Sequence, residues 1–75
     1  ILATRRMNYV RTFNSHQGKS VLRDLARFCR ANTSTFHEQH AIHCKLDGRR
    51  EVWLRIQQPL KLNDAELWRL MTEGD

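Results

Sequence analysis

The sequence predicts a single small all-α domain, a bundle of three to four short helices with a histidine-containing loop between the second and third. Three observations lead to this fold class: apolar residues recur at helical spacing, two segments open with helix-capping side chains, and one proline falls at the end of a periodic segment. A chain of 75 residues has room for one domain only. An apolar fraction of 40%, with two Trp and three Phe, argues against disorder.

The first helix is predicted over residues 2–13. One face of this segment carries its apolar side chains at helical spacing: Leu2, Tyr9, Val10 and Phe13. Arg5 and Arg11 lie off that face.

The second helix is predicted to begin after Asn14 and to end at about Arg30. Asn14 with Gln17 three residues later resembles a capping box, and Ser15 is the alternative cap. One arc of this helix carries the apolar residues Val21, Leu22, Leu25, Ala26, Phe28 and Cys29. Gly18 falls within the same arc, where a glycine would permit another helix to cross closely.

The opposite arc of the second helix carries a basic stripe, formed by Lys19, Arg23, Arg27 and Arg30. The stripe fits either a solvated helix face or a surface that follows a phosphate backbone, helped by other arginines near the N-terminus. No helix-turn-helix, zinc-finger or stacking signature accompanies it, so sequence-specific base recognition is not expected. Contact with a DNA backbone is the nucleic-acid alternative for this protein.

Residues 31–45 show no clear period and are predicted to form a long loop, with a short helical turn after Thr35. The loop contains the potential metal ligands His37, His40, His43 and Cys44. The paired Cys-x₂₋₄-Cys frame of structural zinc sites is missing, so neither a metal nor another cofactor is expected. A disulfide between Cys29 and Cys44 is conceivable, but two reduced thiols in a cytosolic setting are the expectation.

The third helix is predicted to begin at Asp47 and to end at Pro59, since proline cannot donate a helical hydrogen bond. One arc of this helix holds the apolar residues Leu46, Val52, Trp53, Ile56 and Leu60. Arg49 falls in the middle of this arc, where its guanidinium must stack, on Trp53 for example, or be paired with an acid or a partner. Arg50 and Leu54 point away from it. Arg49, Arg50 and Leu54 are therefore the predicted protein-interface residues.

The last helix is predicted over residues 64–71. Asn63 supplies a capping side chain, and acids follow at the first and third helical positions, where the helix dipole favours them. Leu67, Trp68 and Met71 are expected to point inward.

Composition narrows the function classes. The net charge is +5, and ten of the 13 basic residues are arginine, which is favoured where planar contacts to phosphate or carboxylate matter. No apolar run approaches the roughly 20 residues of a membrane span. His43 and Cys44 are adjacent, which rarely gives catalytic geometry, and so small a helical chain offers little concavity for a substrate. We therefore expect a protein that is not an enzyme and that has no catalytic residues.

Two blocks of the sequence carry a family resemblance. The first is residues 12–29. The second is residues 33–37 followed by Gly48-Arg49-Arg50-Glu51-Val52-Trp53-Leu54-Arg55-Ile56-Gln57. Over roughly residues 9–70 the chain resembles a family of short tailed-phage proteins named after a small open reading frame in a Bordetella podophage. Residues 1–8 lie outside the resemblance.

The resemblance implies a location and a kind of partner rather than a chemistry. Genes of this family tend to lie near portal and capsid genes, which implies a minor virion component, bound to portal, internal core, ejection or tail proteins in several copies. The expected location is the virion, with host cytoplasm during assembly. A small basic nucleic-acid-binding or regulatory factor in the infected cell is the alternative.

Overall fold

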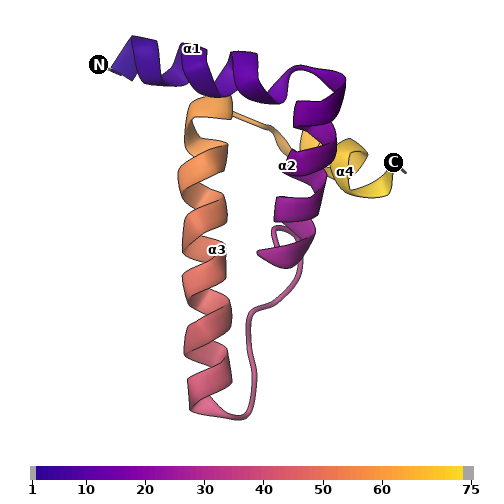
Figure 1. Cartoon of the computed structure of the whole chain (residues 1–75). Coiled ribbons are helices and arrows are strands. Elements are labelled where there is room, and N and C mark those ends of the chain that lie inside the picture. Colours follow the sequence, from indigo (N-terminus) through magenta and orange to yellow (C-terminus); the bar gives the residue numbers. More distant parts are fainter. Residues whose placement is uncertain (1, 74–75) are drawn as a thin grey trace.

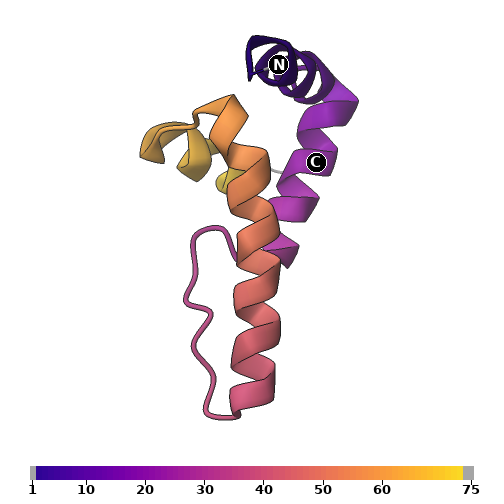
Figure 2. The same cartoon turned by 90° about the vertical axis from the view of Figure 1, so that its left-hand side faces the viewer.

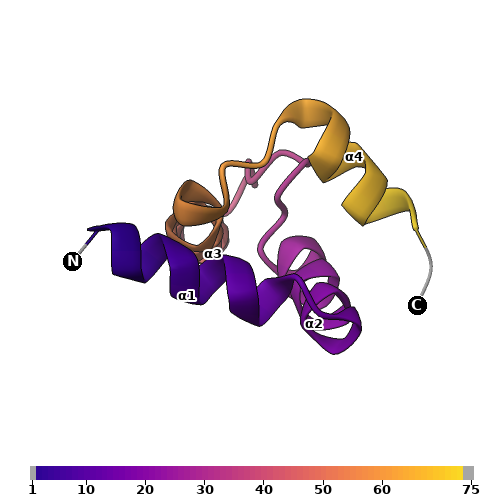
Figure 3. The same ribbon diagram turned by 90° about the horizontal axis from the view of Figure 1, so that it is seen from above.

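The computed structural model describes residues 2–73, except for the side chain of Leu2, whose predicted place on the first helix lies outside the described residues. Four helices make up this part of the chain: α1 (Leu2–Phe13), α2 (His16–Phe28), α3 (His40–Leu60) and α4 (Asp64–Thr72). Over the same range no strand forms, so the predicted all-α class is confirmed. In Figure 1, α2 and α3 run antiparallel, and α1 crosses the upper end of α3. The view from above places α4 beside α2, away from the N-terminal end of α1 (Figure 3).

The core is small and is built where α2 meets α3. Four of its residues form one buried cluster: Leu22, Ala26, Cys29 and Trp53. Trp53 is 0% exposed, so the predicted inward direction of this indole is confirmed. Leucines at the end of α3 and along α4 pack around this cluster with partial burial.

The α1–α2 corner depends on a cap and a close approach. Ser15 is the N-cap of α2, and its Oγ accepts a hydrogen bond from the Gly18 amide at 2.9 Å, which decides between the two predicted caps. A Cβ on Gly18 would lie 2.1 Å from the Thr12 carbonyl oxygen and 2.9 Å from Phe13 Cα. The expected close crossing at Gly18 is therefore real, and the last turn of α1 is what crosses there.

Pro59 lies inside α3 rather than at its end, so the predicted stop is one residue too early. Without an N–H, Pro59 leaves the Arg55 carbonyl, four residues earlier, without its helical donor. The Arg5 guanidinium of α1 donates to that oxygen at 3.3 Å. The Arg55 carbonyl that Pro59 leaves free thus accepts a hydrogen bond that joins α1 to α3. α3 continues to Leu60 and ends with Lys61 in a left-handed conformation.

The loop between α2 and α3 is shorter than predicted, because α3 begins at His40 and not at Asp47. Thr35 fastens the loop to this extra helix: its Oγ1 lies 2.5 Å from Asp47 Oδ1, and its carbonyl lies 3.1 Å from His43 Nδ1. Figure 2 shows the loop running along the lower half of α3. Gln39, the N-cap of α3, makes no side-chain cap hydrogen bond, so tertiary contacts stabilise a start that capping patterns do not mark.

α4 begins as predicted and packs differently. Asn63 and Glu66 form a full capping box, with the Glu66 amide donating to Asn63 Oδ1 at 2.8 Å. Leu67 and Met71 pack against the core. Trp68, also predicted to point inward, is 67% exposed, because the inward stripe passes through Leu70 instead.

The resulting shape is open for a chain of this size. Its accessible surface is 5685 Å², whereas a compact protein of 9.0 kDa exposes about 4,850 Å². The radius of gyration is 13.2 Å, against about 11 Å for a compact domain of this length. The molecule therefore presents roughly 800 Å² more surface than a self-sufficient domain would.

Candidate protein-interaction surface

The three predicted interface residues separate in space. The Arg49 guanidinium carbon lies 4.1 Å from the centre of the Phe28 ring, so Arg49 stacks on α2 and not on Trp53 of its own helix. Arg50 donates to the Thr33 carbonyl and thereby holds the loop against α3. Leu54 is 54% exposed. Arg50 is thus engaged within the chain, while Arg49 and Leu54 remain accessible on different sides of α3.

Phe28 and Arg49 stack on each other, and apolar side chains on the same sides of α2 and α3 are exposed. Val21, two turns before Phe28 on the same side of α2, is 53% exposed, and Phe28 itself is 56% exposed. Val52, one turn after Arg49 on α3, is 54% exposed. The expectation that Val52 lies in the core is therefore wrong, and the predicted apolar arc of α2 is exposed at Val21 and Phe28. We call the surface formed by Val21, Phe28, Arg49 and Val52 the open flank.

The basic stripe of α2 lies elsewhere on the helix and is largely used inside the molecule. Arg23 is only 7% exposed, and its Nε donates to the Leu70 carbonyl at 2.9 Å. Arg27 reaches the Met71 carbonyl at 3.4 Å, and Arg30 reaches the Ser34 carbonyl at 3.2 Å. The solvated face expected for this stripe is wrong at Arg23. Nucleic-acid binding by Lys19, Arg23, Arg27 and Arg30 stays a prediction.

α2 also ends earlier than predicted, at Phe28 rather than Arg30. Arg30 has a φ of 55°, a left-handed conformation that terminates the helix. This end places Cys29 in the core at 2% exposure. Burial raises the pKa of the Cys29 thiol above its ordinary 9.0, although the charge of Arg49 and a hydrogen bond from the Trp53 backbone oppose the shift.

The histidines and cysteines do not assemble into a metal site within residues 2–73, where no group of three potential ligands comes together. Cys44 Sγ lies 3.5 Å from His40 Nε2 on the exposed side of α3. His43 instead bridges the loop and Asp47, with 3.2 Å between Nε2 and Oδ2. Cys29 and Cys44 are free thiols.

Sequence periodicity assigned Phe28 and Val52 to the core because both fall within the apolar arc of their helices. The sequence did contain one signal. Arg49 is a charged residue within an apolar arc, which indicates that part of this arc is not buried. The outward position of Trp68 had no comparable signal, since Trp68 and Leu70 are both apolar and only the packing of α4 selects between them.

Comparison with known proteins agrees with the resemblance seen in the sequence. The family model described as Bbp19-like phage protein matches residues 9–72, which is most of the chain. No curated protein and no solved structure matches it. Among the described helices, none combines the length and apolar character needed to cross a membrane. The chain belongs to the Bbp19-like phage protein family.

Proposed function

We propose that this protein is a minor structural component of a tailed-phage virion that acts by binding other phage proteins and not as an enzyme. The observation that carries the proposal is the open flank. A lone exposed apolar residue is ordinary, but several exposed apolar residues on facing sides of two helices, with a stacked arginine between them, are typical of a protein-binding surface.

The dimensions of the molecule support the same proposal. A standard protein–protein interface takes about 800 Å² from each partner. The accessible surface of this chain, at 5685 Å², is larger than the about 4,850 Å² of a compact protein of its mass, so surface is available for such an interface. The open shape is therefore suited to a protein that completes its packing in an assembly, at a portal, internal core, ejection or tail structure.

Arg49 fits an interface role on the open flank. Its guanidinium covers one part of the Phe28 ring, so the stem and the ring offer a preformed, amphipathic contact. A partner that covers the flank can add a carboxylate at the guanidinium and apolar side chains around it. Leu54 is equally exposed on the other side of α3 and lies outside the open flank, so it serves as a comparison.

The test is mass spectrometry of purified, DNA-filled particles of the encoding phage, followed by variants of the two sides. We expect the wild-type chain to be present in the particles. The double variant Phe28→Ser with Val52→Ser should be lost from them while its circular dichroism spectrum stays helical. Leu54→Ser is the matched control and should be retained.

Absence of the wild-type chain from purified particles would contradict the virion role. Retention of the Phe28/Val52 variant together with loss of Leu54→Ser would place the interface on the other side of α3 and contradict the open flank as the docking surface.

A further inference from the structure

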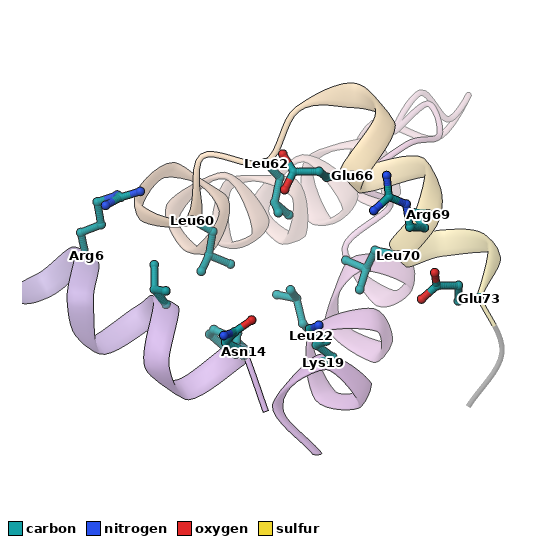
Figure 4. Close-up of a pocket in the computed structure, with 12 residues that line it drawn as sticks. Arg6, Asn14, Lys19, Leu22, Leu60, Leu62, Glu66, Arg69, Leu70 and Glu73 are labelled. Carbon is teal, nitrogen blue, oxygen red and sulfur yellow. The ribbon is translucent and has the colours of Figure 1, made fainter. Parts of the chain in front are cut away.

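A groove lies where the end of α1, the start of α2, the end of α3 and α4 come together. It has a volume of about 350 Å³ and an apolar lining formed by Val10, Phe13, Leu22, Leu60, Leu62 and Leu70. Figure 4 shows the leucines pointing into the gap from different elements. The groove is on the α4 side of α2 and is separate from the open flank.

The rim of the groove carries three basic residues, Arg6, Lys19 and Arg69. Within residues 2–73 the side chains of these three make no hydrogen bond and no ion pair. The two acids of the groove are already engaged. Glu66 accepts from the Asn63 amide at 3.2 Å, and Glu73 lies 3.9 Å from the Arg23 guanidinium. The lining therefore carries three cations and two carboxylates, a net charge of +1, and the three cations have no ion-pair partner within residues 2–73.

We propose that this groove binds an amphipathic helical segment of a partner phage protein, in which acidic residues flank an apolar stripe. The inference rests on the proposed function, since it names the chemistry of a partner that the chain would meet in the particle. A helix placed in such a groove buries its apolar face against the leucines. Its carboxylates then meet the rim cations, which fixes orientation and speeds encounter.

The apolar floor decides between a protein segment and nucleic acid. A phosphate backbone could neutralise Arg6, Lys19 and Arg69, but it has no apolar group to place against the half-buried Leu62 and Leu70. Its binding would depend on charge alone and would leave the leucines in water. An acidic amphipathic helix satisfies both parts of the groove.

The test uses the whole chain, labelled with nitrogen-15, and a synthetic helical peptide of about 16 residues with a leucine stripe between glutamates. We expect amide shifts to change in Leu22, Leu62 and Leu70 and their neighbours. A peptide with lysines in place of the glutamates should bind at least ~10-fold more weakly. The double variant Lys19→Glu with Arg69→Glu should weaken the acidic peptide by ~10-fold or more, and the neutral Lys19→Gln with Arg69→Gln by less.

Lys45→Glu is the matched control, because Lys45 is exposed on α3 far from the groove, and it should leave peptide binding unchanged. Equal binding of both peptides, shifts confined to other surfaces, or no binding would overturn the inference. So would displacement of the peptide by duplex DNA with no effect of the leucine stripe. If the peptide binds but the chain is missing from particles, the proposed virion role fails and the inference about the groove stands. If the chain is present in particles but the peptide does not bind, only the inference about the groove fails.

Discussion

Two flanks of α2, one with arginines and one with apolar side chains, differ in burial, and the difference is opposite to the usual rule that apolar residues are buried and charged residues exposed. On one flank two arginines, Arg23 and Arg27, donate hydrogen bonds to α4; Arg23 is buried at 7% exposure, whereas Arg27 stays exposed. On the other, about 130° around the helix, Val21 and Phe28 are more than half exposed. The charged flank therefore holds a buried arginine that contacts α4, whereas the apolar side chains of the other flank are exposed.

The reason lies at the end of α4. The last four carbonyls of a helix have no helical donor, and they form the negative end of its dipole. Two of them, on Leu70 and Met71, accept hydrogen bonds from Arg23 and Arg27. The guanidinium groups of α2 therefore cap the C-terminal end of α4. Burial on this helix therefore depends on the hydrogen bonds that α4 requires, and the apolar flank stays exposed in this chain.

The largest effect is expected at the residue beneath both flanks. Trp53 is 0% exposed and belongs to the only buried cluster in the described part of the chain. Trp53→Ala should lower the free energy of unfolding by about 3–5 kcal/mol, which for so small a core amounts to unfolding. Urea titration followed by circular dichroism measures this loss.

Trp68→Ala is the matched control, since the same side chain is removed from a site that is 67% exposed. It should change the free energy of unfolding by no more than about 0.5 kcal/mol. Similar losses for the two tryptophans would mean that α4 packs differently and that the comparison of flanks is wrong.

The next largest effect concerns the covered flank. Arg23→Ala removes the donor to Leu70 O and leaves a partly buried carbonyl without its partner, so we expect a loss of about 1–3 kcal/mol. Hydrogen exchange should speed up first in α4. Lys19→Ala, on the same stripe but exposed, should change stability by less than about 0.5 kcal/mol. If Arg23→Ala left the free energy of unfolding unchanged, the contact with α4 would contribute nothing to stability.

Much of this fold could be predicted from local pattern. α1 and the start of α4 are as predicted, because capping side chains and helical apolar spacing act within a few residues. The start of α3 could not be predicted in this way. Residues 40–46 acquire their helical state from Thr35 and the rest of the loop, which contact Asp47 and His43 across the fold.

The candidate site was predictable only in part. Arg49 was identified because a charge in an apolar arc needs a partner, but its partner is Phe28 on another helix and not the nearby Trp53. Periodicity shows which residues share an arc. It does not show where a neighbouring helix stops covering that arc. Phe28 and Val52 lie beyond the covered part and are therefore exposed.

A smaller effect is expected from the thiol beneath the open flank. Because burial raises the pKa of Cys29, the folded chain holds that proton more tightly than the unfolded chain. Stability from this group is fully present below pH 9.0 and is lost as the pH rises toward the folded-state value. We expect the free energy of unfolding to fall by up to about 1.4 kcal/mol per pH unit in that range. Cys29→Ala should abolish this slope.

Thiol labelling checks the same difference at neutral pH. Cys44 is exposed and should react with a maleimide in the folded protein, whereas Cys29 should react only when urea unfolds the chain. Rapid labelling of Cys29 in the native state would show that the core opens without global unfolding.

The smallest effect, and the one that bears most directly on the open flank, is expected for Phe28→Ala. The ring is 56% exposed and its main contact is Arg49, so its removal should cost at most about 1 kcal/mol in the isolated chain. A surface kept for a partner should matter little to the monomer and much to the assembly. A loss above roughly 2 kcal/mol in urea titration would place Phe28 in the monomer's own core. The open flank would then be part of the fold, and its exposed residues would no longer support a docking role.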